Sequence, residues 1–575
     1  MISDPTKSTA TSLRLWPALA LVALLWGLAN LPALFQEPPL PVFMAAFLGP
    51  LACVLLIIIW WVAGSRASGR EKLMGLGGLV LLFVATWLLL HPTMRGFPLF
   101  SMVLPWGGTA FVLGLAAARW VRTWPRAAVA LTAVALAFGF WTLVRMDGVW
   151  GDMQSERTWR WRPTPEESYL AQRTSGDGGA EVLEAVAEAE WPGFRGASRD
   201  AVVPGIVLAE DWSTRPPQVL WRTPLGPSWS SFAVAGQRLF TQEQRGEFEA
   251  VVAYDTETGS ELWAQEYSSR FFEAMGGVGP RATPTLAHGM LFTLGAEGLL
   301  YRLNPETGEV VWKADLRKDA ERDPPTWGFS SSPLVVDGVV VVHAGGEGDK
   351  GVLAYGIDDG GVHWSAPAGG HTYSSPQLVQ VAGQRSVALV CDAGVSLIAP
   401  ADGSVVWRHE WPHNSYRVLQ PQVVGDSTLL MSSDFNGTRR LDLRPEGDGL
   451  AAEERWTTRA MKSGFNDYVA HKGSLYGFDP NILTAVDLET GKRQWKGGRY
   501  GNGQLLLLPD ADQLLVLTEK GEIALLRANP ERLEEIARFK AVDGKTWNHP
   551  ALVGDRLYVR NAEEMVALAM PLRSP

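Results

Sequence analysis

The sequence predicts an eight-bladed β-propeller of four-stranded blades, preceded by an α-helical transmembrane domain. Three observations carry this prediction: an aromatic residue that recurs about every 45 residues, a polar segment in the same register, and five apolar stretches near the N-terminus. A repeat of about 45 residues has the length of one propeller blade. We therefore divide the 575 residues into a five-span transmembrane domain (1–145), a linker with a short helix (146–190) and the propeller (191–575).

The recurring aromatic residue is a tryptophan, which in the sharpest copies follows a turn of the form Asp-x-x-Thr-Gly. The marks are Trp221, Trp263, Trp312, Trp364, Trp407, Trp456 and Trp495, and Phe539 takes the same place in the last copy. Asp and Thr hydrogen-bond the local backbone in such a turn, and Gly accepts its positive φ. We expect each tryptophan to lock neighbouring blades by burying its ring while its N–H reaches a backbone acceptor.

A polar segment begins an apolar strand some 30 residues before each tryptophan. The eight segments contain Ser230-Ser231, Arg281-Ala282-Thr283, Ser331-Ser332, Ser374-Ser375, Gln420-Pro421-Gln422, Asn466-Asp467, Asn502-Gly503-Gln504 and Asn548-His549. The last segment has no tryptophan after it, and Trp221 has no segment before it. Residues 547–570 are therefore expected to supply three strands of one blade and the segment around Trp221 the fourth. N- and C-terminal strands then close the ring, which removes exposed sheet edges.

Five apolar stretches precede residue 145, each with about the 17–25 residues that a membrane-spanning helix needs. They cover 16–35, 41–63, 73–90, 99–118 and 127–144. A cleaved signal peptide would account for one of them. Basic residues gather in alternate loops, at Lys7 and Arg14, at Arg66, Arg70 and Lys72, and at Arg119, Arg122 and Arg126. The positive-inside rule then predicts a bacterial inner-membrane protein with a cytoplasmic N-terminus and a periplasmic propeller.

Composition and charge exclude several classes of function. The net charge is −10, from 51 basic and 61 acidic residues without a long run of one sign, so nucleic acid is not expected as a partner. Cys53 lies in an apolar stretch and Cys391 in a predicted strand, so we expect no disulfide framework, CxxC metal pair or CxxCH haem site. In the linker, 180–190 is predicted to form a short Ala/Glu helix.

The form Ala-x-Asp-x-x-Thr-Gly-x-x-x-Trp, present at 253–263, resembles the repeat of pyrroloquinoline quinone (PQQ) dehydrogenases and their non-catalytic relatives. The resemblance covers about residues 191–575. Five spans before an external propeller are similar to the layout of membrane-bound quinoprotein glucose dehydrogenase. Segments such as 191–196, 501–504 and 544–550 look like those of membrane-anchored or secreted PQQ-like propeller proteins. A second relative is the propeller lipoprotein of the outer-membrane barrel assembly machinery, a scaffold without cofactor.

The polar segments begin the inner strands that line a propeller's central channel, so we expect their side chains to converge at one mouth. The predicted ligand-binding residues are Arg281, Trp327, Tyr373, Asn466, Asp467, Arg499, Asn502, Trp547, Asn548 and His549. Arginine suits the carboxylates of a planar quinone such as PQQ and aromatic rings suit its faces. No metal site is assigned, although Asp467 with the amide oxygen of Asn466 suits calcium.

Alternatives stand beside these assignments. Ser, Asn and Gln at strand starts also satisfy backbone groups in a narrow channel. His371 and His549 are better explained as hydrogen-bonded channel residues than as metal ligands, because no spacing pairs them. Glu243 and Glu273 are candidate general bases, but isolated carboxylates in predicted loops are more often solvated. Blades of about 45 residues leave little length for loops over a cofactor, and Cys391 stands alone where many soluble quinoproteins carry a cysteine pair.

Two functions therefore remain open from the sequence. The first is a membrane-anchored binding or scaffold module that engages a protein, peptide or small-molecule ligand at the channel mouth and needs no cofactor. The second is a dehydrogenase with PQQ and calcium that oxidises a sugar or alcohol and passes electrons to a membrane quinone. No catalytic residue can be assigned to the second, because no local motif of the catalytic families is matched.

Overall fold

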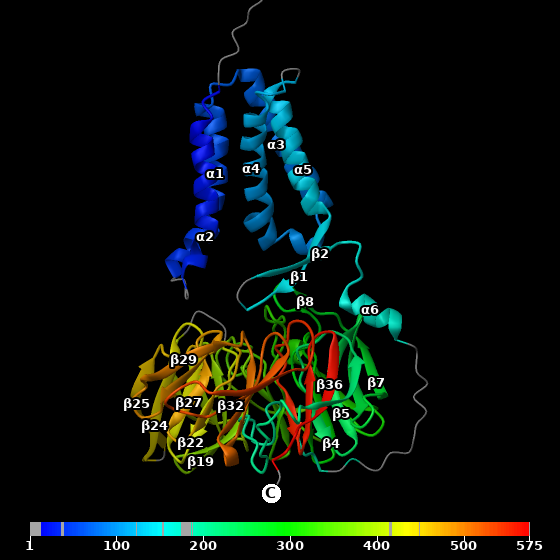
Figure 1. Cartoon of the computed structure of the whole chain (residues 1–575). Helices are drawn as coiled ribbons and strands as arrows, with labels where there is room; N and C mark the ends of the chain where they lie inside the picture. The colour runs from blue at the N-terminus through cyan, green and yellow to red at the C-terminus, as the bar shows by residue number, and fades with distance from the viewer. Residues whose placement is uncertain are drawn as a thin grey trace, which may run out of the picture. The chain divides into compact units, whose positions relative to one another are not determined.

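The computed structural model describes residues 13–35, 40–121, 124–151, 154–173, 186, 188–412, 417–447 and 449–573 (Figure 1). The chain forms two compact units. The helical unit comprises Met1–Val149 with Ser155–Pro163, and the propeller unit comprises Trp150–Gln154 with Thr164–Pro575. The helix expected over 180–190 lies largely outside the described residues.

Within its described residues, the helical unit contains five α-helices, which lie in the five apolar stretches. They are α1 (Trp16–Ala29), α2 (Leu40–Ile59), α3 (Gly69–Leu89), α4 (Leu104–Ala117) and α5 (Arg126–Thr142), with short turns η1 (Leu31–Leu34), η2 (Trp60–Gly64), η3 (Pro92–Met94) and η4 (Leu99–Val103). Three continuous helical stretches are long and apolar enough to cross a membrane: Pro41–Gly64, Gly69–Leu89 and Leu99–Ala117. The other two apolar helices are shorter: α1 has 14 residues, below the range of a spanning helix, and α5 has 17, at its lower limit.

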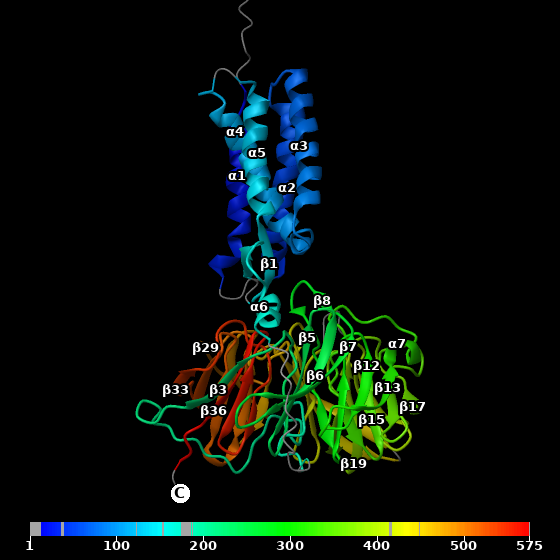
Figure 2. The same ribbon diagram turned by 90° about the vertical axis from the view of Figure 1, so that its right-hand side faces the viewer.

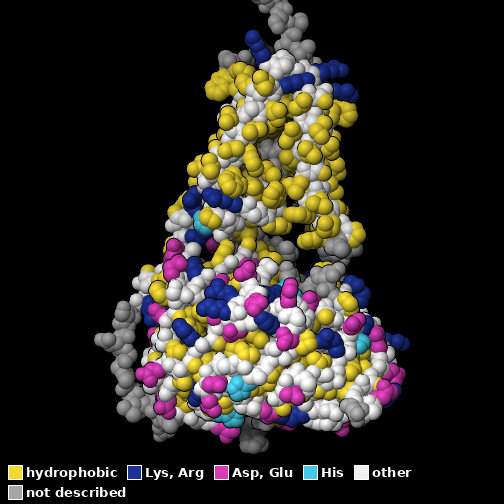
Figure 3. Space-filling view, turned by 180° about the vertical axis from the view of Figure 1, so that it is seen from behind, with side chains coloured by type: hydrophobic (Ala, Val, Ile, Leu, Met, Phe, Trp, Pro, Cys, Tyr) yellow, Lys and Arg dark blue, Asp and Glu magenta, His cyan; other side chains and the backbone are white. Residues whose placement is uncertain are grey.

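Local chemistry sets the ends and the packing of these helices. Ser68 and Glu71 form a capping box at the start of α3, and Glu71 also pairs with Arg126 at the start of α5, 3.1 Å away. A Cβ on Gly114 would lie 2.6 Å from the Cα of Ala130, so this glycine lets α4 approach α5 closely. Hydrophobic side chains cover the sides of the unit, and Lys and Arg side chains gather towards its ends (Figure 3).

The propeller unit contains eight four-stranded antiparallel sheets, as the repeat predicts. Blade 1 is β4 (Ala233–Ala235), β5 (Arg238–Arg245), β6 (Phe248–Asp255) and β7 (Glu261–Ser268), and blade 2 is β10 (Thr285–Ala287), β11 (Met290–Leu294), β12 (Leu299–Leu303) and β13 (Val310–Asp315). Blade 3 is β14 (Leu334–Val336), β15 (Val339–His343), β16 (Val352–Gly356) and β17 (Val362–Ala366), and blade 4 is β18 (Gln377–Val381), β19 (Gln384–Cys391), β20 (Gly394–Ile398) and β21 (Val405–Glu410).

The second half of the ring continues in chain order. Blade 5 is β22 (Gln422–Val424), β23 (Thr428–Ser433), β24 (Gly437–Glu446) and β25 (Gly449–Thr458), and blade 6 is β26 (Val469–His471), β27 (Ser474–Phe478), β28 (Ile482–Asp487) and β29 (Arg493–Arg499). Blade 7 is β30 (Gln504–Leu508), β31 (Gln513–Leu517), β32 (Glu522–Arg527) and β33 (Glu535–Lys540), with the short turn η5 (Pro509–Ala511). Blade 8 is β34 (Ala551–Val553), β35 (Arg556–Arg560), β36 (Glu564–Ala569) and β3 (Gln218–Pro224).

Blade 8 closes the ring in the way the sequence predicts. Its three inner strands come from the C-terminus, and β3 pairs with β36 so that Trp221 lies opposite Ala567. The last blade then stands beside the first, where Arg560 of β35 donates to the Thr241 hydroxyl of β5 at 2.6 Å; Figure 2 shows the propeller from the side. This closure pairs both ends of the array and leaves it without an exposed terminal sheet.

Six tryptophans bond the neighbouring blade through their indole N–H. The acceptors are the carbonyl oxygens of Thr256 for Trp221, Pro305 for Trp263, Ile357 for Trp312, Pro400 for Trp364, Leu488 for Trp456 and Asn529 for Trp495, at 2.7–3.1 Å. The glycine of that neighbouring turn lies flat against the ring: a Cβ on Gly308 would come within 2.5 Å of Trp263. The Asp-x-x-Thr-Gly turn of one blade and the tryptophan of its neighbour thus form a single contact between blades.

Two places depart from this pattern. The β24–β25 hairpin replaces the Asp-x-x-Thr-Gly turn in blade 5, and Trp407, which faces it, stacks on His409 with ring centroids 5.9 Å apart. Phe539 does not take the tryptophan position of blade 7. A β-bulge precedes each tryptophan, and the bulge of blade 7 puts Ala537 in that register, two residues earlier. In blade 8 the two outer strands, β36 and β3, are not joined by a turn. Blade 8 therefore has no turn against which a tryptophan of blade 7 could pack.

Besides the helices α1–α5 and the turns η1–η5, six elements of the described ranges lie outside the blades. β1 (Val144–Val149) pairs with β2 (Ser155–Trp159), α6 (Pro165–Gln172) packs on blade 1, the two-residue strands β8 (Phe272–Glu273) and β9 (Gly277–Val278) form a hairpin between blades 1 and 2, and α7 (Leu316–Asp319) follows blade 2. The Tyr169 hydroxyl of α6 donates to the Glu243 carboxylate, 2.7 Å away. Glu243 is fully buried in β5, which corrects its assignment as a solvated loop residue.

Candidate ligand-binding pocket

The segment 191–205 runs through the centre of the ring as a plug. Trp191 N–H donates to the Val234 carbonyl of blade 1, and Leu286 N–H of blade 2 donates to the Pro192 carbonyl. Further along, Val203 N–H donates to the Leu507 carbonyl of blade 7. These three contacts lie inside the inner strands β4, β10 and β30, so both ends of the plug run along the wall of the channel.

Two buried arginines hold the plug. Arg199 donates to the carbonyl oxygens of Pro376, Ser332 and Pro333 at 2.7, 3.1 and 2.8 Å, and burial lowers its pKa to about 9. Arg195 adopts the left-handed conformation, with a φ of 62°, and its Nε lies 3.2 Å from a carboxylate oxygen of Asp467. The plug therefore bridges blades 3, 4 and 6 with charged donors.

Asp467 is the counterion at the centre of the ring. Its second carboxylate oxygen lies 2.8 Å from Nε2 of His549, whose Nδ1 lies 2.8 Å from the Pro550 carbonyl. The two ring nitrogens of His549 thus face the Asp467 carboxylate and the Pro550 carbonyl. Burial acts to raise the pKa of Asp467, but Arg195 and His549 outweigh it and hold that pKa below its usual value.

The polar strand starts tie every pair of neighbouring blades around the axis. In the first half of the ring, the N–H groups of Ser231, Thr283 and Ser332 donate to the hydroxyls of Thr283, Ser332 and Ser375 at 2.9–3.0 Å. In the second half, side-chain amides of Gln420, Gln422, Gln504 and Asn548 donate to carbonyls of the adjacent blades at 2.6–3.2 Å. These residues satisfy backbone groups, which is the structural alternative that the sequence left open.

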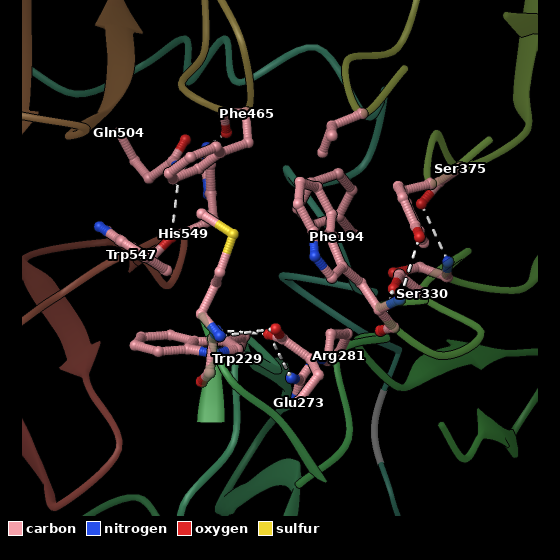
Figure 4. A pocket seen from close by; sticks show the side chains of 16 residues that line it. Phe194, Trp229, Glu273, Arg281, Ser330, Ser375, Phe465, Gln504, Trp547 and His549 are labelled. Atoms are coloured by element: carbon pink, nitrogen blue, oxygen red, sulfur yellow. Dashed lines mark hydrogen bonds and ion pairs between the residues drawn. The ribbon is translucent and has the colours of Figure 1, made fainter. Parts of the chain in front are cut away.

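A cavity of about 200 Å³ opens at the mouth formed by the strand starts. It is lined by Phe194, Trp229, Glu273, Met275, Gly276, Arg281, Trp327, Ser330, Ser332, Tyr373, Ser375, Val418, Phe465, Gln504, Trp547 and His549. Phe194 of the plug lies near the centre, with Trp229 and Trp547 on one side and Ser330 and Ser375 on the other (Figure 4). The plug therefore forms part of the lining of this pocket.

Aromatic pairs make up most of the wall. The ring centroids of Trp229 and Trp547 lie 4.9 Å apart, and Phe465 packs edge-on against Trp547 at 4.9 Å. Trp327 stacks on Tyr373 at 5.0 Å, and its backbone N–H donates to the Tyr373 hydroxyl. Such offset and edge-to-face pairs are the favoured arrangements of aromatic rings, so the wall is held in a fixed shape.

One ion pair closes the side of the pocket formed by the β8–β9 hairpin. Arg281 lies 3.3 Å from the carboxylate of Glu273, and it also donates to the Gly277 and Gly279 carbonyls. Burial lowers the pKa of Arg281 to about 10, and Glu273 opposes that shift. The indole N–H of Trp229 donates to the Gly276 carbonyl at 2.6 Å, which fixes the hairpin against blade 1.

Five of the ten predicted binding residues line this cavity: Arg281, Trp327, Tyr373, Trp547 and His549. The structure places the other five elsewhere. Asp467 lies behind His549, Asn466 donates to the Pro480 carbonyl, and Asn548 donates to Ser228 and Ser230. Arg499 ends β29 with an exposed side chain, and Asn502 N–H donates to Glu519. The convergence that the sequence suggests is therefore partial, because alternate residues of a strand start point to opposite sides.

Sequence reasoning did not assign Phe194, Trp229, Met275 or Phe465 to the site. Trp229 and Phe465 immediately precede polar segments, and Phe194 belongs to a Trp-Pro-Gly-Phe-Arg-Gly run that precedes the first strand. The aromatic, glycine-containing segment 191–196, which lies before the first repeat, was the one feature of the sequence that pointed to the plug.

Asp467 and Asn466, the residues that the sequence suggests for calcium, do not line this pocket. The carboxylate oxygens of Asp467 lie 3.2 Å from Nε of Arg195 and 2.8 Å from Nε2 of His549, and the side-chain Oδ1 of Asn466 accepts the Gly464 N–H. Across the described ranges, no three His, Cys, Asp or Glu side chains are arranged to hold a metal ion. Arg281 already satisfies Glu273 and two carbonyls, which leaves little for a carboxylate-bearing cofactor.

Comparison with known proteins identifies the repeat. A family model described as outer membrane protein assembly factor BamB matches residues 214–315 and 276–497. BamB of Shewanella oneidensis is 24% identical over 342 residues, covering 55% of this chain and 78% of that protein. BamB of Yersinia pestis is 22% identical over 325 residues, covering 54% and 70%.

Solved propellers are similar at lower identity. BamB from Moraxella catarrhalis is 14% identical with a TM-score of 0.44, covering 62% of this chain and 99% of that one. A quinohemoprotein alcohol dehydrogenase from Pseudomonas putida is 12% identical with a TM-score of 0.47, covering 69% and 82%.

Proposed function

The chain is a PQQ-like β-propeller protein, and from this premise we propose that it is a membrane-anchored, non-catalytic binding module. Its helices anchor it in the bacterial cytoplasmic membrane. Its propeller engages a polypeptide partner on the periplasmic side, through the aromatic pocket at one mouth of the channel. The matched relatives are named as assembly factors, which supports a protein partner.

One observation carries the binding role. The channel mouth holds a preformed cavity walled by paired aromatic rings, and the channel behind it is filled by the chain's own plug. Pockets of this kind, mostly apolar with a few placed polar groups, are typical binding sites. The plug places Phe194 beside His549, with ring centroids 5.9 Å apart, in the space where a cofactor would need to enter.

Length and charge support the membrane anchor. Three helical stretches of 24, 21 and 19 residues are apolar enough to cross a bilayer. Arg66 precedes α3, Arg70 lies in its first turn and Arg119 lies between α4 and α5, and the positive-inside rule assigns such basic ends to the cytoplasm. Arg145, which follows α5, is paired with Asp147 at 2.6 Å and is buried, so it adds little to the opposite side.

A cross-linking experiment tests the partner. Met275 at the pocket and Phe248 at the β5–β6 turn have matched exposures of 41% and 44%. We expect p-benzoylphenylalanine in place of Met275 to give a discrete protein adduct in living cells, and the same group in place of Phe248 to give none. Equal labelling at both positions would show that the partner does not bind specifically at the pocket.

A second assay addresses catalysis. The purified full chain, supplied with PQQ and calcium, should neither bind the quinone nor reduce a dye with a panel of sugars and alcohols. Saturable PQQ binding together with dye reduction would replace the binding role by the dehydrogenase role.

A further inference from the structure

We infer that the pocket receives one neutral aromatic side chain, presented by an extended segment of the partner polypeptide. This inference rests on the proposed function and specifies its ligand. The argument uses the volume of the cavity, the charge of its rim and the chemistry of its floor.

The volume selects a side chain over a whole cofactor. The cavity measures about 200 Å³. Pockets for drug-sized ligands are larger, at roughly 300–1,000 Å³. The cavity cannot extend further into the channel. Phe194 of the plug lines it, and so do Ser332 and Ser375, whose hydroxyls accept hydrogen bonds from neighbouring blades. A single large side chain therefore matches the space available.

Charge at the rim excludes ionic side chains of either sign. The Lys545 ammonium lies 4.5 Å from the Trp547 ring centroid and 5.3 Å from that of Trp229, so the cation–π position on this wall is taken by the chain itself. An incoming lysine or arginine would meet this like charge. Glu273 lies beside Trp229, where the Gly276 N–H donates to its carboxylate, and it opposes an incoming carboxylate, while its own charge is balanced by Arg281. A neutral group avoids both costs.

The walls favour an aromatic group over an aliphatic one. Trp229–Trp547 and Trp327–Tyr373 present ring faces and edges to the cavity, and a third ring can extend such offset or edge-to-face packing. The thioether of Met275 lies at the same cavity, and sulfur packs well on ring edges. A leucine would gain apolar burial without these directional contacts.

The floor favours a ring that carries a donor. The hydroxyl oxygens of Ser332 and Ser375 each accept one backbone N–H. A hydroxyl oxygen has two lone pairs, so each can accept a second hydrogen bond, from an indole N–H or a phenol O–H. The expected order of preference is therefore tryptophan and tyrosine, then phenylalanine, then leucine.

The partner's flanking residues have an apolar surface to lie on. Phe272 and Met275 of the β8–β9 hairpin are 51% and 41% exposed beside the pocket. Exposed aromatic and methionine side chains grouped at a cavity are typical of protein contact sites. The hairpin is anchored by Trp229 and Glu273, so this surface is present before the partner arrives.

Peptide titration tests the inference. The probes are acetylated, amidated Gly-Ser-Gly-X-Gly-Ser-Gly peptides with Trp, Tyr, Phe, Leu, Lys or Glu at X, added to the full chain in lipid nanodiscs and followed by saturation-transfer NMR. Empty nanodiscs correct for membrane binding. We expect the Trp and Tyr peptides to bind at least 10-fold more tightly than the Leu, Lys and Glu peptides.

Variants locate the binding. Trp327→Ala should weaken the Trp peptide at least 10-fold, and Met275→Ala, which removes an exposed side chain and spares the fold, should weaken it about 3-fold. Phe248→Ala should leave it unchanged. Equal affinity for all six peptides, or equal loss in Trp327→Ala and Phe248→Ala, would overturn the inference. If the Met275 cross-link persists in that case, the binding module stands and only the aromatic specificity fails; loss of the cross-link overturns both.

Discussion

Asp467 and His549, from the sixth and eighth blades, meet at the centre of the ring with a carboxylate oxygen 2.8 Å from Nε2. Arg195 of the plug completes the group from the other carboxylate oxygen, at 3.2 Å. All three side chains are almost fully buried. The group therefore connects the N-terminal plug with two blades of the closing half of the ring, and its integrity is coupled to the closure of the propeller.

Asp467→Asn should destabilise the propeller by about 3 kcal/mol, because it leaves the buried Arg195 charge without its counterion. Urea denaturation of the full chain in detergent measures the change. The control is Asp337→Asn, which breaks an exposed pair with Arg385 (2.6 Å) and should cost less than about 1 kcal/mol. Similar losses in both variants would show that the central group does not depend on charge.

The same group predicts a pH dependence. The pKa of Asp467 is lowered in the folded protein, so its contribution is complete above the unfolded value of about 3.9 and is lost as the pH falls through the folded value. The stability difference between the wild type and Asp467→Asn should be constant from pH 7 to 5 and should shrink below pH 4. A difference that grows on acidification contradicts this assignment.

Gly308→Ala should destabilise the propeller more than Gly289→Ala does. Both glycines have positive φ, 76° and 68°, so alanine costs about 1–2 kcal/mol of backbone strain at each. Only at Gly308 does the added Cβ meet the Trp263 ring, whereas nothing lies within 4 Å at Gly289. Thermal unfolding of the two variants separates the contact between blades from the backbone term, and equal shifts would deny the glycine a role in that contact.

Tyr169→Phe should loosen α6 without affecting the ring. The variant removes one hydrogen bond to the buried Glu243, which is worth about 1.4 kcal/mol, or a 10-fold faster amide exchange in residues 165–172. Hydrogen exchange with mass spectrometry measures it. Tyr267→Phe, which removes a matching bond to Glu249 in the same blade, should leave α6 protection unchanged.

Alkaline phosphatase fusions test the proposed topology. Fusion after Pro575 should be active, because the enzyme needs oxidising conditions to form its disulfides, and fusion in the loop at Arg119 should be inactive. A green fluorescent protein fused at Arg119 should be fluorescent, because the proposed topology places that loop in the cytoplasm. An active phosphatase at Arg119 would reverse the orientation.

The sequence predicted the fold well because the repeat is local. The turn, the bulge and the tryptophan all lie within one repeat, and each blade is stabilised by contacts with neighbouring blades of the same kind. The spacing of the repeat was therefore enough to predict eight blades and ring closure at Trp221. The same reasoning misplaced Phe539, because where the turn degrades only the strand register shows that Ala537 holds the position.

The residues of the pocket were predicted less well from the sequence than the fold was. Five of the ten proposed residues line the cavity, whereas Asp467 holds the plug, Asn548 bonds the next blade and Asn466 bonds Pro480 within its own blade. A polar residue at a strand start reads the same in sequence whether it faces a ligand or a carbonyl of the next blade. Only the partner atom distinguishes the two cases, and that atom often lies far away in the sequence: on Tyr468 for Gln422, 46 residues on, and on Ser230 for Asn548, 318 residues back.

The sequence by itself determined the blade count, the closure of the ring and the apolar helices that precede it, because periodicity and hydropathy act over short distances. The tertiary structure decided that 191–205 fills the channel, that Asp467 serves Arg195 and His549, and that Phe194, Trp229 and Trp547 meet at one mouth. These contacts join segments from opposite ends of the chain. They exist only because eight blades converge on one axis, and no local pattern encodes that convergence.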